Sequence, residues 1–206
     1  MCGKDPLPSQ SSGPLTQEAI LSTAERLLRR HGPCKTTVSD VARNLGVSHA
    51  SIYRYFDNKA SLRAAVVRGW LDRPLPALNR IVNDANTVAP QRLSRWLQSL
   101  YETRKNQARD DPELFAAFFE LAVEEGEAVR EHVEDLRNQL RRILVDGQSE
   151  GSFEDIEPAV DAAAVLDSTT RFHHPSHARN WSRSTIDADF EGVLRLVIRA
   201  LARDRA

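Results

Sequence analysis

Hydrophobic residues recur along this 206-residue chain at the three- and four-residue spacing of amphipathic helices. Ile20, Ala24, Leu27 and Leu28 form one such stripe, which predicts a helix from about Thr16 to His31. In the second part of the chain the spacing is the same, and no segment alternates as a half-buried strand does. We therefore expect an all-α protein of about nine helices.

Two short amphipathic segments with a glycine turn between them lie within residues 37–62. Thr37 and Ser48 are residues that cap helix N-termini, and Gly46 tolerates the left-handed conformation in which helices commonly end. Two short helices joined in this way can place the second helix in the major groove of DNA. The stretch therefore predicts a helix-turn-helix followed at once by a further helix.

The order of these residues is also similar to a known signature. The pattern T-V-x-x-V-A-x-x-L-G-V-S-x-x-x-I-Y-x-Y-F-x-x-K-x-x-L, from Thr37 to Leu62, resembles the N-terminal motif of the TetR family of transcriptional regulators. Ile52 and Phe56 are its positions expected to be buried. The resemblance covers roughly residues 15 to 70, and the rest matches only in length and helical character. It implies an all-helical homodimer that represses transcription and is released from its operator by a small molecule.

Position-wise resemblance also assigns candidate DNA contacts: Thr36, Thr37, Ser48, His49, Ala50, Ser51, Tyr53, Arg54, Tyr55 and Lys59. Arg54 can donate two hydrogen bonds to a guanine or clamp a phosphate. The serine and tyrosine hydroxyls and Lys59 suit phosphates, and Thr36 and Thr37 can bring a helix N-terminus to the DNA backbone. One of Tyr53 and Tyr55 could instead pack between helices.

The net charge of −1 is distributed unevenly. From Leu15 to Arg73 there are ten Lys and Arg against five Asp and Glu, whereas from Pro74 onward there are seventeen against twenty-three. Alone, this asymmetry could be chance. Together with the motif it favours a protein that offers one basic face to phosphates.

Composition and motif together predict three parts. Residues 1–14 are rich in Pro, Ser and Gly and are expected to be a disordered tail. Residues 15–62 are expected to form the DNA-binding domain, and residues 63–206 a helical bundle for ligand binding and dimerisation.

Prolines mark the helix boundaries in the expected bundle. Pro74 and Pro76 should end or kink the helix that carries Gly69 and Trp70 toward the core. Later helices should start at Pro90 and at the pairs Asp111-Pro112 and Glu157-Pro158, because proline is favoured in the first turn of a helix.

Aromatic and apolar side chains of the bundle could line a ligand cavity or simply form its core: Trp96, Leu100, Tyr101, Phe115, Phe118, Phe119 and His132. Few basic residues are expected to face the same way, so the predicted ligand is hydrophobic or amphipathic, neutral or cationic, and not phosphorylated. The ten acids between Asp110 and Asp135 could attract a cation or form a solvated face. Arg95 and Arg104 would favour an anion if they turned inward.

The last helix carries a larger apolar stripe than its own core needs: Phe190, Leu194, Val197, Ile198 and Leu201. We expect the last two helices to pair with those of a second copy, around a two-fold axis.

Three histidines, His173, His174 and His177, lie close enough in sequence to suggest a metal. No Cys, Asp or Glu lies among them, and Pro175 makes a corner, so we expect a turn with surface or interface histidines. Neither a metal nor a cofactor is predicted.

Other classes of protein find little support. Catalytic motifs are absent, which argues against an all-helical enzyme. Cys2 and Cys34 are too few for a disulfide framework, and there is neither a membrane-spanning apolar run nor a signal-peptide core, so a cytoplasmic protein is expected. A helical interaction or scaffold protein that does not bind DNA remains an alternative.

Overall fold

The computed structural model describes residues 14–32 and 36–202. The predicted tail, apart from Pro14, and both cysteines lie outside these residues. The described residues form twelve helices, nine of them seven residues or longer, and no strand. The prediction of an all-α fold is therefore confirmed. The chain divides after Val66 into two compact units, which are described separately below.

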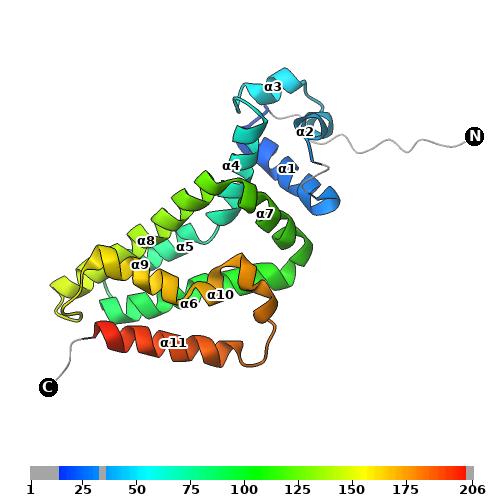
Figure 1. Ribbon diagram of the computed structural model, residues 1–206. Helices are drawn as coiled ribbons and strands as arrows, with labels where there is room; N and C mark the ends of the chain where they lie inside the picture. The colour runs from blue at the N-terminus through cyan, green and yellow to red at the C-terminus, as the bar shows by residue number, and fades with distance from the viewer. Residues whose placement is uncertain (1–13, 33–35, 203–206) are drawn as a thin grey trace, which may run out of the picture. The chain divides into compact units, whose positions relative to one another are not determined.

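The first unit is built from three helices and the start of a fourth (Figure 1): α1 (Gln17–His31), α2 (Val38–Leu45), α3 (His49–Tyr53) and α4 (Lys59–Leu71). Its core contains the predicted stripe of α1 together with residues of the later segments, all of them buried: Val38, Val41 and Ala42 of α2, and Ile52, Phe56 and Leu62. Leu45, at the end of α2, is half-buried. Helix α2 contacts both α1 and α3. This packing gives the short α3 the support that five residues cannot supply alone.

Local sequence signals begin and end these helices as predicted. The Thr37 Oγ1 accepts from the Asp40 N–H at 3.2 Å, and the Asp40 carboxylate accepts from the Thr37 N–H at 3.1 Å, which completes a capping box. Gly46 ends α2 with a φ of 69°, in the left-handed region. The Ser48 hydroxyl then caps α3 by accepting from the Ser51 N–H at 3.1 Å.

Three details differ from the sequence prediction. Helix α3 ends at Tyr53, so Arg54 and Tyr55 follow the recognition helix. Gly69 is exposed and does not face the core. Helix α4 ends at Leu71, shortly before Pro74 and Pro76 as predicted, but residues 75–82 form a further helix that was not predicted, α5 (Leu75–Val82), because proline is tolerated in the first turn of a helix, where its missing N–H costs nothing.

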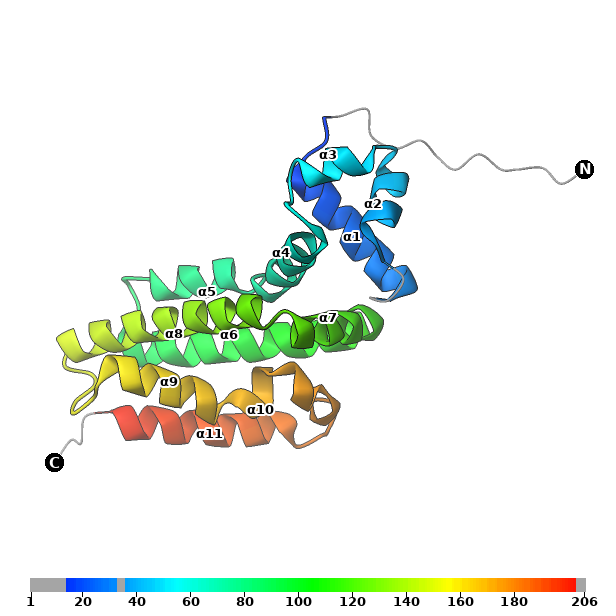
Figure 2. The ribbon, with the colours of Figure 1, turned by 45° about the horizontal axis from the view of Figure 1, so that its top comes forward.

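The second unit is a bundle organised around α6, which contacts α5, α7, α8, α10 and α11. Its helices after α4 and α5 are α6 (Ala89–Asp110), α7 (Pro112–Glu124), α8 (Gly126–Ser149), α9 (Pro158–Ser168), α10 (Thr170–His173), the 3-10 helix η2 (Pro175–Asn180) and α11 (Ile186–Leu201). Figure 2 shows α5 on one side of the α6 and α8 pair and the α9–α11 segment on the other. The predicted starts at Pro90, Asp111-Pro112 and Glu157-Pro158 are confirmed to within one residue.

Arg92 connects neighbouring helices at one end of this bundle. Its side chain is 5% exposed and donates to the carbonyl of Val82, at the end of α5, at 2.9 Å. It also pairs with Asp146 at 2.6 Å and with Glu150 at 2.9 Å. The Glu150 carboxylate additionally accepts from the N–H of Ala89, the first residue of α6, at 2.9 Å. One buried guanidinium thus joins three helices.

A close approach at Gly147 fixes the same end of the bundle. A Cβ atom at this position of α8 would collide with the ring of Phe153 and with the side chain of Ala89. Phe153 is buried and forms an isolated bridge with Ala202, just beyond α11. Only glycine therefore allows the loop after α8 to fold back onto the helix. Within the described residues, no helix combines the length and the apolar character that crossing a membrane requires.

Candidate nucleic-acid interface and ligand site

Polar and aromatic side chains of α3 and the turn after it lie on the surface of the first unit. His49, Ala50, Tyr53 and Arg54 are all exposed, with Tyr53 at 45%. We call these four residues the reading surface. Ile52, between them in sequence, is fully buried and anchors α3. Because α3 follows a capped turn, its outward side chains are held on a short, rigid element.

Arg54 is free to bind an external partner. It caps the C-terminal end of α3, and among the described residues its guanidinium has no hydrogen-bond or ion-pair partner. The same is true of the side chains of His49, Tyr53 and Lys59. Unpaired donors on an exposed helix are what base edges and phosphates require.

The candidate contacts at the start of α2 are already engaged. The Thr37 hydroxyl donates to the Asp40 carboxylate at 2.6 Å, and the Thr36 hydroxyl donates to the carbonyl of Gly32 at 2.9 Å. Hydrogen bonds from Thr37 lower the pKa of Asp40, so a negative charge stays at this helix end. A phosphate here would have to share or break these bonds.

Tyr55 and the two serines also have partners within the first unit. The Tyr55 hydroxyl donates to the carbonyl of Leu15, which ties the turn after α3 to the segment before α1. The Ser48 and Ser51 hydroxyls lie 2.9 Å apart and share a hydrogen bond. Of the two tyrosines left open by the sequence, Tyr55 therefore has the structural contact and Tyr53 projects without one.

The seven candidate ligand-site residues separate into different clusters of the bundle. Leu100 and Trp96 are buried, and the Trp96 indole donates to Gln139 at 2.8 Å. Phe118 stacks on Trp70 with ring centroids 5.0 Å apart, and Phe115 meets the same indole edge-on at 5.3 Å. Trp70, Phe115 and Phe118 thus form one aromatic cluster. Phe119 on α7 instead makes an edge contact with His174.

Tyr101 belongs to a second cluster. It stacks on Phe190 with centroids 4.5 Å apart and meets Phe172 edge-on at 5.9 Å. Its hydroxyl donates to Asp187 at 2.5 Å, and burial together with that carboxylate raises the Tyr101 pKa well above its ordinary value. The predicted single cavity therefore does not gather all seven residues.

Arg104 turns inward, the outcome that the sequence analysis identified as favouring an anion. Only 3% of the residue is exposed, and its guanidinium lies 5.1 Å from the centroid of the Trp70 ring. It donates to Gln107 at 3.1 Å, to the Leu71 carbonyl at 3.0 Å and to His132 at 3.1 Å. Arg95, by contrast, stays on the surface, where it pairs with Asp84.

His132 connects Arg104 to an acid. Since a guanidinium only donates, the His132 Nε2 accepts from Arg104, and the Nδ1–H therefore donates to Asp72 at 2.9 Å. Burial lowers the pKa of His132, which keeps the imidazole neutral. Burial alone would raise the pKa of Asp72, but hydrogen bonds from His132 and Arg68 hold it below its ordinary value.

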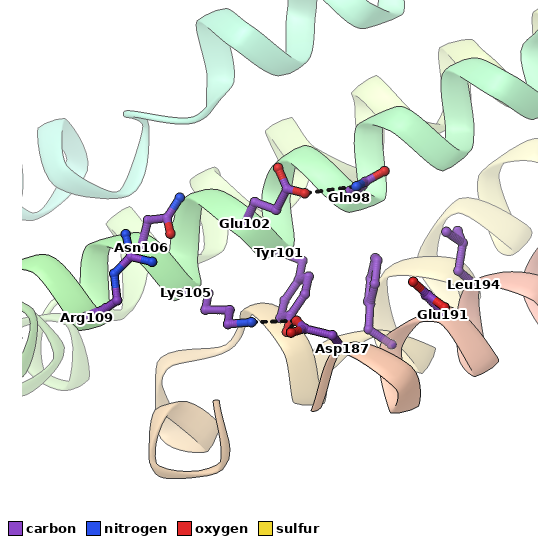
Figure 3. A pocket seen from close by; sticks show the side chains of 10 residues that line it. Gln98, Tyr101, Glu102, Lys105, Asn106, Arg109, Asp187, Glu191 and Leu194 are labelled. Atoms are coloured by element: carbon purple, nitrogen blue, oxygen red, sulfur yellow. Dashed lines mark hydrogen bonds and ion pairs between the residues drawn. The ribbon is translucent and has the colours of Figure 1, made fainter. Parts of the chain in front are cut away.

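A groove of ≈ 610 Å³ runs between α6 and α11 (Figure 3). In Figure 3, Tyr101 and Lys105 of α6 point toward Asp187 of α11, and Lys105 pairs with that carboxylate at 2.5 Å. Charges of both signs line the groove, including Glu102 and Arg109. Sequence reasoning did not find this groove, because contact between α6 and α11 depends on tertiary packing.

The predicted dimer stripe is partly used within the single chain. Phe190 and Leu201 are buried, at 4% and 6% exposure. Leu194, Val197 and Ile198 are half-buried and keep surface that a second copy could cover. Leu196, outside the predicted stripe, is 65% exposed on the same helix.

The three histidines lie where the chain turns from α10 into η2. The His173 Nε2–H donates to the Leu166 carbonyl at 3.2 Å, and burial lowers the pKa of His173 to about 4. The His174 Nδ1 and the Ser176 hydroxyl lie 2.7 Å apart and share a hydrogen bond. Among the described residues, no group of three or more His, Cys, Asp or Glu could hold a metal ion.

Family models match both units of the chain. Residues 20–66 match the model of bacterial regulatory proteins of the tetR family, and residues 89–194 match the model of a tetracyclin repressor-like C-terminal domain. A curated relative, an HTH-type transcriptional regulator of Mycobacterium tuberculosis, is 35% identical over 120 residues, which cover 57% of this chain and 55% of the relative. The chain thus spans about half the length of that relative.

Solved structures of regulators share the fold. A putative transcriptional regulator from Pseudomonas aeruginosa gives a TM-score of 0.68 at 18% identity, over 89% of this chain and 88% of that one. The regulator FadR from Bacillus subtilis in complex with stearoyl-CoA gives 0.65 at 17% identity, over 90% of this chain and 100% of that one. At these identities the likeness concerns the fold alone.

Proposed function

Because the chain belongs to the TetR family of bacterial regulatory proteins, we propose that it is a one-component transcriptional repressor. In this proposal a cytoplasmic homodimer binds a palindromic operator, with one α3 in each half-site. A small molecule bound in the bundle favours a dimer geometry in which the two reading surfaces no longer match successive major grooves. The ligand acts only through its preference for that geometry.

The observation that carries the proposal is the reading surface. The side chains of His49 and Tyr53 on α3, and of Arg54 directly after it, are exposed and have no partners among the described residues. Arg54 is suited to a guanine, through O6 and N7, and Lys59 to a phosphate. The engaged hydroxyls of Thr36 and Thr37 make those residues weaker candidates.

Two features of the bundle support the other parts of the proposal. Leu194, Val197 and Ile198 give α11 a half-buried apolar strip for pairing with a second copy. The fold also accommodates ligands in a relative, since the FadR neighbour was solved with stearoyl-CoA. We therefore expect the effector of this protein to bind among the helices of its second unit.

Fluorescence anisotropy with DNA from the region upstream of its own gene tests the proposal. We expect binding that exceeds binding to a scrambled duplex and that weakens with salt as phosphate contacts require. Arg54→Ala should cost about 1–3 kcal/mol, concentrated at one base position. Arg30→Ala, which removes the same charge from exposed α1, is the matched control and should cost less.

Failure of the wild-type protein to distinguish the two duplexes would favour the alternative of a helical interaction protein. The dimer is tested separately by sedimentation at micromolar concentration. Leu194→Asp should give monomers or aggregates, because it places a charge in the proposed interface, whereas a monomeric wild type would contradict the dimer.

A further inference from the structure

The surroundings of Arg104 are unusual for a buried guanidinium. Its hydrogen-bond partners are an amide oxygen of Gln107, the backbone carbonyl of Leu71 and the Nε2 of His132. None of these groups is charged. Among the described residues, no carboxylate lies within ion-pair distance of Arg104.

Such an arrangement is costly unless a further group compensates the charge. Moving a cation out of water is unfavourable, and in proteins a directly bonded anion normally offsets this free-energy cost. Burial lowers the Arg104 pKa only to about 10, so the side chain is charged at neutral pH. The nearest compensation is Asp72, which acts through the His132 ring.

The walls around this charge are aromatic. Trp70 lies against the guanidinium, Phe118 stacks on the same indole, and Phe115 meets it edge-on. Phe115 also meets the Trp181 ring edge-on, with ring centroids 5.8 Å apart. A positive centre inside an aromatic cluster matches a molecule with an anionic head and an apolar body.

Gln107 is the most exposed of the side chains around Arg104. Its side chain is half-buried, whereas Arg104, Trp70 and His132 are almost fully buried. Gln107 supplies a neutral amide oxygen on a side chain that can rotate away, from three residues along the same helix. An incoming carboxylate that displaced Gln107 would exchange a neutral acceptor for a charged one, which bonds a guanidinium about twice as strongly.

We propose that Arg104 is the receptor for the carboxylate of a small organic acid, whose apolar body packs against Trp70 and Phe115. The acid accepts two hydrogen bonds from the guanidinium and displaces the Gln107 side chain. This inference names the effector class and so rests on the proposed function for its regulatory meaning. It replaces the neutral or cationic ligand expected from the sequence.

Calorimetric titration of the full chain without DNA tests this chemistry. The probes are straight-chain acids from butyrate to dodecanoate and phenylacetate, each with its uncharged amide, together with octylamine. We expect at least one acid to bind about tenfold more tightly than its amide, and octylamine not to bind. Equal binding of acids and amides, or no binding by any acid in the series, would overturn the proposal.

Two variants with opposite expected effects separate binding from folding. Arg104→Gln should weaken the best acid by about tenfold or more, whereas Gln107→Ala should tighten it, because the competing amide is gone. Arg95→Gln is the matched control, since this surface arginine of α6 pairs with Asp84 and should leave affinity unchanged. If Arg104→Gln retains the affinity, or Gln107→Ala weakens it, Arg104 is not the receptor.

Failure of this inference is distinguishable from failure of the proposed function. Operator binding with no response to any acid leaves a DNA-binding regulator whose effector has other chemistry. If acid binding depends on Arg104 but the protein does not bind DNA, the carboxylate site is supported and the proposed function as a transcriptional repressor is contradicted.

Discussion

Helix α6 buries two arginines, Arg92 near its start and Arg104 in its second half, and the two differ in the charge of their hydrogen-bond partners. Arg92 is paired with two carboxylates, Asp146 and Glu150, which belong to the neighbouring helix and the residue after it. Arg104 is equally buried but has only neutral hydrogen-bond partners. The first arrangement satisfies a buried charge, and the second leaves it able to gain from an anion. Burial alone therefore does not distinguish a structural arginine from a binding one, whereas the partners do.

The largest effect that would test this comparison is expected at Arg92. Arg92→Met leaves Asp146 and Glu150 without their counter-ion and removes the donor to the Val82 carbonyl. We expect a loss of about 2–3 kcal/mol in the free energy of unfolding, measured with urea, chiefly because the buried Val82 carbonyl loses its donor while the two carboxylates stay partly solvated. Arg95→Met, on the exposed side of the same helix, should change it by less than about 0.5 kcal/mol. A similar small change for Arg92→Met would remove the structural assignment.

A second difference between the ends is that His132 and His173 lie near Arg104. The pKa of His173 is about 4 in the fold, against an ordinary value of 6.5, so the unfolded chain takes up its proton first. Stability is therefore fully present above about pH 6.5 and falls as the pH drops toward 4.

Because of this difference in the His173 pKa, the free energy of unfolding of the wild type should fall by up to about 2 kcal/mol between about pH 7.5 and pH 5. His173→Gln, which can still donate to the Leu166 carbonyl, should lose most of that dependence in urea unfolding at the two pH values. The lowered pKa of His132 adds to the wild-type loss in the same direction. Stability that rises on acidification would contradict the sign.

The smallest effect on stability is expected at Arg104. Arg104→Met replaces an unpaired buried charge with an apolar side chain of similar length, and replacements of this kind are often neutral or stabilising. We expect a change within about 1 kcal/mol, in either direction, in the same urea experiment. A loss as large as that of Arg92→Met would show that Arg104 is part of the scaffold.

The sequence predicted the elements whose causes are local. Thr37, Gly46 and Ser48 each act through a bond to a residue a few positions away, so the helix-turn-helix could be placed from the sequence alone. Pro74 and Pro76 were interpreted only as the end of the preceding helix, which is confirmed, and helix α5 was missed because proline is equally compatible with the first turn of a new helix.

The direction of Arg104 depends on contacts from distant parts of the chain. Its partners Leu71 and His132 lie 33 and 28 residues away, on other helices. The periodicity of α6 places Arg104 one turn from Leu100 and cannot say whether the guanidinium reaches inward or into solvent. For the same reason the groove between α6 and α11, with its Lys105–Asp187 pair 82 residues apart, was not foreseen.

The bond between Arg104 and His132 also gives the protein a built-in spectroscopic reporter. Because the guanidinium offers only hydrogens, the imidazole carries its single proton on Nδ1, the less common tautomer of free histidine. The two ring nitrogens then differ strongly in their ¹⁵N resonance frequencies, as protonated and bare nitrogens do. A spectrum of histidine-labelled protein would therefore record, at one atom pair, whether Arg104 is still bonded to His132 or has turned to another acceptor.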